Sequence, residues 1–197
     1  MANTRHVYGR RVPNVRHSKA DPNWGTPPDI LDQCRLTLGG EVSLDPLSSL
    51  IANRAVRAER IWTVSDDGFA QQWVGPRVLV NPPGGTVRRA WKKLIEEYLA
   101  GRFERAVWVG FSVEQLCVLA EPRGARTLEQ RIAGGDLDPL DFSVAILRKR
   151  ISFVREDGTE GSPCHGNWIG AVGCSARDFE TAWAHLGVCV HGDLVAR

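Results

Sequence analysis

The feature that most constrains the fold is a strand–helix–strand succession in the middle of the chain. A compact apolar run at 77–80 stops at Asn-Pro-Pro-Gly-Gly, and residues 87–98 then carry apolar side chains at helical spacing. The next apolar run, 106–109, has the composition of a strand that is buried on both faces. A unit of this kind places its two strands parallel in one sheet with the helix packed across them.

The flanking elements extend this pattern in both directions. Thr26-Pro27-Pro28-Asp29 predicts a helix start with Thr26 as N-cap and Pro27 as the first helical residue, and Gly39 predicts its end. Further elements are expected as a short strand within 41–45, a short helix at 112–120, strands at 144–147, 151–154 and 168–172, and a helix that begins after Ser175 and stops at Gly187. We therefore expect an α/β fold, a sheet flanked by helices that is parallel early and antiparallel late.

Charge is unevenly distributed along the chain, although the formal net charge is only +2. Residues 1–22 form a basic arm with little apolar periodicity, whereas 23–197 is expected to form one domain. The longest apolar runs are only a few residues, so we expect no membrane span and no secretory signal. Five widely spaced cysteines favour a reduced cytoplasmic compartment and match no common zinc site: Cys34, Cys117, Cys164, Cys174 and Cys189.

The residues after the 77–80 strand are the candidates for a functional site. Ligands of open α/β sheets bind beyond the carboxyl ends of strands, where Asn81-Pro82-Pro83 lies. Asn81 offers an amide oxygen, and successive prolines hold the Pro82 carbonyl on a rigid backbone. Two fixed acceptors suit a planar exocyclic amine with two hydrogens, since binding both hydrogens draws the nitrogen lone pair out of conjugation. Taken alone, the Asn-Pro-Pro segment is also typical of an ordinary turn at a strand end.

In this context the sequence resembles the phage-encoded DNA N6-adenine methyltransferases, small single-domain enzymes of the Dam type. The resemblance covers about 24–172 and rests on landmarks in sequence order: Trp24-Gly25-Thr26-Pro27; Ser43-Leu44-Asp45-Pro46 with Asn53; Asp66-Asp67-Gly68-Phe69 with Trp73; Val78-Leu79-Val80-Asn81-Pro82-Pro83; Trp91-Lys92-Lys93; and Arg150-Ile151-Ser152-Phe153. It implies a Rossmann-like methyltransferase sheet and S-adenosylmethionine-dependent methyl transfer to the exocyclic amine of adenine in DNA. A phage enzyme of this kind would act in the cytoplasm of a bacterial host.

Site residues follow from the resemblance position by position. The catalytic segment would be Asn81, Pro82 and Pro83. The S-adenosylmethionine site would comprise Trp24, Thr26, Pro27, Asp45, Pro46, Asp66 and Asn81. An acid could hold the ribose hydroxyls or the α-ammonium group of the cofactor, and the sequence does not separate the roles of Asp45 and Asp66.

DNA contacts are expected from basic side chains near the site and in the arm. They are Arg10, Arg11, Arg88, Arg89, Lys92, Arg148 and Arg150.

Two departures from the family pattern keep alternatives open. The family motif ends in an aromatic residue that stacks on a flipped base, whereas position 84 is glycine; Trp24, Phe111 and Trp168 are candidates to replace it. The segment after Asp45 also lacks the Gly-x-Gly of larger methyltransferases and has Ser48 and Ser49 instead. The alternatives are methylation of cytosine N4, or a catalytically weakened relative that serves as a DNA-binding or interaction module.

Overall fold

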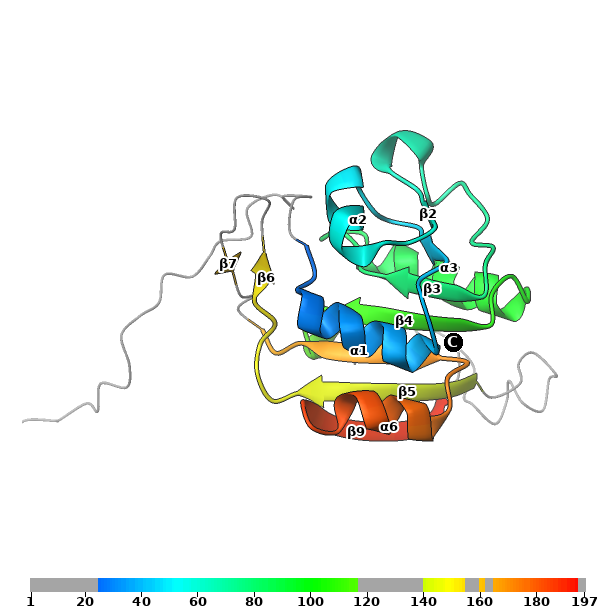
Figure 1. The fold of residues 1–197 in the computed structure, drawn as a ribbon. Coiled ribbons are helices and arrows are strands. Elements are labelled where there is room, and N and C mark those ends of the chain that lie inside the picture. The colour runs from blue at the N-terminus through cyan, green and yellow to red at the C-terminus, as the bar shows by residue number, and fades with distance from the viewer. Residues whose placement is uncertain (1–24, 117–139, 155–159, 162–164, 195–197) are drawn as a thin grey trace, which may run out of the picture.

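A mixed sheet forms the centre of the molecule in the computed structural model, which describes residues 25–116, 140–154, 160–161 and 165–194 (Figure 1). Within these residues seven strands pair in the order β2-β1-β3-β4-β8-β5-β9. Their bounds are β1 Leu44–Asp45, β2 Arg60–Ile61, β3 Arg77–Val80, β4 Arg105–Gly110, β5 Leu140–Leu147, β8 Trp168–Val172 and β9 Gly187–Leu194. A separate pair joins β6 (Phe153–Val154) to β7 (Glu160–Gly161).

The direction of the strands changes once along the sheet, between β4 and β8. Strands β2, β1, β3 and β4 run parallel to their neighbours. Strand β8 is antiparallel to both β4 and β5, and β9 is antiparallel to β5. The expected α/β sheet, parallel early and antiparallel late, is therefore confirmed. Its central parallel pair is the predicted unit, since β3 leads through α3 (Val87–Leu99) into β4.

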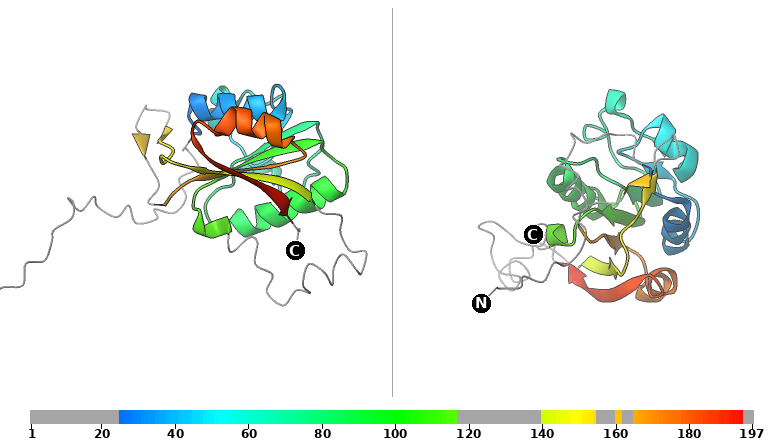
Figure 2. Two further views of the ribbon diagram at one scale, coloured as in Figure 1. Left: turned by 90° about the horizontal axis from the view of Figure 1, so that it is seen from below. Right: turned by 90° about the vertical axis from the view of Figure 1, so that its left-hand side faces the viewer.

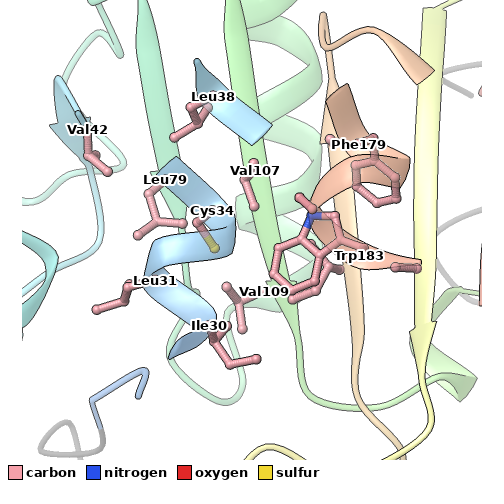
Figure 3. Packing of buried hydrophobic residues seen from close by; sticks show 14 of the residues in the cluster. Ile30, Leu31, Cys34, Leu38, Val42, Leu79, Val107, Val109, Phe179 and Trp183 are labelled. Carbon is pink, nitrogen blue, oxygen red and sulfur yellow. The ribbon is translucent and has the colours of Figure 1, made fainter. Parts of the chain in front are cut away.

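Helices cover both faces of the sheet (Figure 2). Helices α1 (Pro28–Leu38) and α6 (Ala176–Trp183) pack side by side on one face, α2 (Leu50–Val56) lies against α1, and α3 covers the opposite face. Under α1 and α6, buried side chains such as Leu79, Val107 and Trp183 interlock (Figure 3). Under α3 the core is aromatic: Trp91 meets Trp108 and Trp168 at centroid distances of 5.1 and 6.0 Å. None of the helices in the described ranges is long and apolar enough to cross a lipid bilayer.

Three local predictions were wrong. Helix α1 begins at Pro28 with Pro27 as its N-cap, because the Thr26 hydroxyl contacts another part of the chain. The 151–154 run contributes only Phe153–Val154, and this strand lies outside the main sheet. Gly187 does not end α6, which stops at Trp183; it begins β9, an unpredicted edge strand. Ser175 does cap α6 as predicted, accepting a hydrogen bond from the Asp178 amide.

Candidate active site

The strand order creates a switch point between β1 and β3. From β1 the chain passes through α2 to β2 on one side, whereas from β3 it passes through α3 to β4 on the other. Connections that diverge in this way leave a crevice beyond the carboxyl ends of the two strands, the usual ligand position in open α/β sheets. Asp45 is the last residue of β1 and Asn81 directly follows β3, so both predicted residues lie at this position.

Asp45 and Asn81 also share one face of the sheet. Leu44 and Val80 belong to the core cluster under α3, and side chains alternate along a strand, so the residue after each turns toward the α1 face. Leu44 pairs with Val78, which places Asp45 level with Leu79 and two positions short of Asn81. Standard strand spacings put their α-carbons roughly 8 Å apart.

Asn81 is held by one end of its amide group. Its Nδ2 donates a hydrogen bond of 3.0 Å to Oγ1 of Thr26, a buried residue 55 positions earlier in the chain. The other end, Oδ1, is buried, and no residue in the described part of the chain is its hydrogen-bond partner. Among the described residues no hydrogen bond ends on the Pro82 carbonyl oxygen either. The two acceptors that the sequence singled out thus receive no donor from the described residues, and a buried unpaired polar atom requires an explanation.

Asp45 is a buried carboxyl group with a 3% exposed side chain. Burial raises its pKa to about 6, against the lowering effect of hydrogen bonds from the Ser48 side chain and the Leu47 amide. The Leu47 contact is long, at 3.4 Å. No cation among the described residues acts on this carboxyl group. A buried carboxylate without a cationic partner favours a ligand that supplies positive charge or hydroxyl donors.

The segment before α1 is fastened beside Asn81. Gly25 and Val154 exchange two backbone hydrogen bonds, of 2.8 and 3.1 Å. Next to Val154, Phe153 packs its ring on Phe111 at a centroid distance of 5.2 Å. Phe111 follows β4 and packs against the core cluster under α1, so it lies on the same side of the sheet as Asn81.

Asn167 links three segments near the strand ends by hydrogen bonds, and it was not among the residues predicted from the sequence. Its Oδ1 accepts from the Ile151 amide at 2.8 Å, and its Nδ2 donates to the carbonyls of Gly110 and Phe111 at 3.2 and 3.4 Å. The side chain is fully buried. The sequence did contain one signal for it. A single Asn directly before the apolar run 168–172 is expected to be buried, and a buried amide has to form hydrogen bonds.

The loop after β2 packs against the segment after β1. Gly68 lies so close to Pro46 that an added β-carbon would stand 1.9 Å from the Pro46 carbonyl oxygen. Asp66, however, uses its carboxylate locally: Oδ2 accepts from the amide and hydroxyl of Thr63 at 2.8 and 2.7 Å. These hydrogen bonds hold the Asp66 pKa below its usual range. Asp66 is exposed, and of the two predicted acids Asp45 is the one at the switch point.

The turn after Pro83 carries no aromatic ring. Gly84 is exposed, and the Pro83 carbonyl accepts from the amide and hydroxyl of Thr86 at 3.1 and 2.7 Å. Thr86 occupies the N-cap position of α3, but its side chain forms no capping hydrogen bond. Trp168 is fully buried under α3 and is wrong as a replacement for the missing ring. Phe111, partly buried, lies on the required side.

The predicted DNA-contacting cations have differing surroundings. Arg88, Arg89 and Lys92 are exposed on α3, the helix that follows the Asn81–Pro83 segment. Arg89 stacks over Phe69 at 4.0 Å, and Lys92 pairs with Glu96 at 3.6 Å. Beyond β5, Arg148 donates to the Ala184 and His185 carbonyls at 3.2 and 3.3 Å and so caps the end of α6. Arg150 is exposed after β5, at the same edge of the sheet as Asn81. Trp24, Arg10 and Arg11 lie outside the described residues.

Comparison of the chain with protein-family models, with curated proteins and with solved structures found no match.

Proposed function

We propose that this protein is an S-adenosylmethionine-dependent methyltransferase that acts on the exocyclic N6 of adenine in DNA. The observation that carries the proposal is the pair of unused acceptors after β3, Asn81 Oδ1 and the Pro82 carbonyl oxygen, next to the buried acid at the end of β1. The sheet is compatible with a Rossmann-like fold, and its switch point lies where such folds bind nucleotide-like ligands.

The residues present fit the cofactor. Asp45 would hold its ribose hydroxyls or its α-ammonium group, since this buried carboxyl lacks a cation among the described residues. Pro46, packed against Gly68, and the segment Thr26–Pro27 would border the same site. When bound, S-adenosylmethionine supplies a methyl group on a positively charged sulfur, which is already a strong electrophile.

The chain's own residues then have one principal task, to hold the target amine. Asn81 Oδ1 and the Pro82 carbonyl oxygen would each accept one hydrogen from the amine, which directs the nitrogen lone pair away from the ring. The bound cofactor would supply its methyl group to this nitrogen and leave as the neutral thioether, and the methylated nitrogen would then release one proton to water. Proximity and orientation supply most of the acceleration, so no residue has to act as a general base first.

The buried state of Asn81 Oδ1 adds a requirement. An amine reaches this oxygen only when neighbouring groups move aside, so base binding is expected to be accompanied by a local conformational change. Gly84 is exposed and would lie at the solvent side of the motif, where a base turned out of the duplex would approach.

The test is methyl transfer from labelled S-adenosylmethionine to duplex DNA, with wild type beside Asn81→Ala. Removing one positioned polar group from a buried site is expected to reduce turnover by about 100-fold or more. Cofactor affinity, measured by calorimetry, should change little, because Asp45 carries that contact. Digestion of the product identifies the methylated nucleoside.

Each outcome has a distinct meaning. The proposal is supported if wild type forms N6-methyladenine and the variant does not. If wild type forms N4-methylcytosine, the same two acceptors bind the exocyclic amine of cytosine instead. Equal transfer by both proteins would refute the role of Asn81. DNA binding by a wild-type protein that binds no S-adenosylmethionine would refute the enzyme and favour a binding module.

A further inference from the structure

The closest partner of the proposed catalytic amide is a threonine from a remote segment. Thr26 is 5% exposed, and its Oγ1 accepts the 3.0 Å hydrogen bond from Asn81 Nδ2. The sequence pattern predicts this hydroxyl as the N-cap of α1, but the N-cap is Pro27 and no side-chain capping bond is formed. The hydroxyl therefore serves Asn81 and not the helix.

Thr26 is itself fixed on both sides. The preceding residue, Gly25, is bridged to Val154 through two backbone hydrogen bonds. The following residue, Pro27, has a restricted φ of −66°, and its carbonyl accepts the Leu31 amide at 3.1 Å in the first turn of α1. A hydroxyl held between a β-bridge and a helix start has little freedom to follow a moving partner.

An asparagine side chain needs such an anchor because rotation about its single bonds would move its amide oxygen away from a bound amine. With Nδ2 on Thr26, Oδ1 lies on the side of the amide that faces away from Thr26. The contact removes this rotational freedom before the substrate binds. We infer that Thr26 is a positioning residue whose hydroxyl holds the Asn81 side chain in the place where Oδ1 can accept from the substrate, an inference that rests on the proposed function.

The test compares Thr26→Val with Thr26→Ser. Valine has the shape of threonine without the hydroxyl, so turnover is expected to fall by about 10- to 100-fold. The KM for DNA should stay within about threefold, since the DNA loses no contact. Because Thr26 also borders the proposed cofactor site, turnover is compared at saturating S-adenosylmethionine. Serine restores the hydroxyl and should restore turnover to within about threefold of wild type.

Thr37→Val is the matched control. Thr37 is also a buried threonine of the α1 region, and its hydroxyl pairs with Trp183 Nε1 at 2.8 Å at the far end of the helix. This variant loses a buried hydroxyl without touching the site, so it should retain wild-type turnover at temperatures where it is folded. A fall in both valine variants alike would overturn the positioning role and indicate a general loss of structure.

A second readout does not depend on activity. The side-chain NH2 resonances of Asn81 are identified in 15N spectra as the pair absent from Asn81→Asp. In Thr26→Val their exchange with solvent should accelerate about tenfold, and in Thr26→Ser it should stay slow, as expected for a hydrogen bond of ordinary strength.

The two readouts separate the possible failures. Unchanged exchange, or an active wild type with a fully active Thr26→Val, overturns the inference and leaves the proposed function standing. A wild type that neither binds S-adenosylmethionine nor transfers methyl groups overturns the proposed function and the inference with it, even where the exchange data confirm the contact.

Discussion

Replacing Asp45 by asparagine should stabilise the protein at neutral pH. Asp45 is 3% exposed, and burial raises its pKa from an ordinary 3.8 to about 6, while no described cation offsets the charge. Above pH 6 the folded protein therefore holds a buried carboxylate that the unfolded chain would hold in water. Asparagine has nearly the same shape, carries no charge and can still accept the Leu47 amide.

The size of the effect follows from the two pKa values. The folded state binds the proton more tightly than the unfolded state, so the free energy of unfolding falls as pH rises from about 4 to about 6. The rise from 3.8 to about 6, at about 1.4 kcal/mol per pKa unit, gives a penalty of about 3 kcal/mol above pH 6. Asp45→Asn should recover up to that amount at pH 7.5, or roughly 6–12 °C in Tm, and almost nothing at pH 4.

The assay is urea unfolding of wild type and Asp45→Asn at pH 4 and pH 7.5. Asp66→Asn is the control of opposite sign: hydrogen bonds from Thr63 lower the Asp66 pKa, so its carboxylate stabilises the fold at neutral pH and loses this effect as pH falls. Asp66→Asn should therefore be less stable than wild type at pH 7.5. An Asp45→Asn variant that gains nothing at pH 7.5, or gains equally at both pH values, would refute the reasoning.

The same substitution also tests function. If Asp45 holds the cofactor through its carboxylate, Asp45→Asn should bind S-adenosylmethionine more weakly while being more stable, a trade-off that is common at functional sites. Wild-type affinity should likewise decline as pH falls below about 6, where the carboxyl group takes up its proton. Calorimetry at pH 5 and 7.5 measures both effects, and a pH-independent affinity would exclude the Asp45 carboxylate as a ligand.

Three further substitutions test the surroundings of the site. Gly84 is exposed and has no positive φ, so the fold should tolerate Gly84→Tyr. The added ring should stack on the base with about 1–3 kcal/mol and so lower the KM for DNA. An unchanged KM would show that this turn does not face the base. Gly68→Ala places a β-carbon 1.9 Å from the Pro46 carbonyl oxygen and should cost roughly 1–3 kcal/mol in urea unfolding, whereas an unshifted midpoint would contradict the close packing. Asn167→Ala leaves the buried Ile151 amide unpaired and should also destabilise by about 1–3 kcal/mol, with wild-type stability as the contrary result.

Local sequence determined the elements whose signals lie within a few residues. The strand Arg77–Val80 has the predicted bounds, since an apolar run that meets Asn-Pro-Pro has only one place to stop. Gly39 ends α1 with a φ of 75°, a conformation that glycine adopts without strain. Ser175 caps α6 through the amide three residues on. The place of Asn81 directly after this strand also followed from sequence alone.

Long-range packing decided the rest, because it brings together groups that compete for the same side chain. The Thr26 hydroxyl has a local use as a helix cap and a remote use at Asn81, and the remote contact prevails. Trp168 lies under α3 since its strand turns that face inward. The meeting of Asp45 with Asn81 depends on the order of strands in the sheet, which periodicity within each strand does not encode.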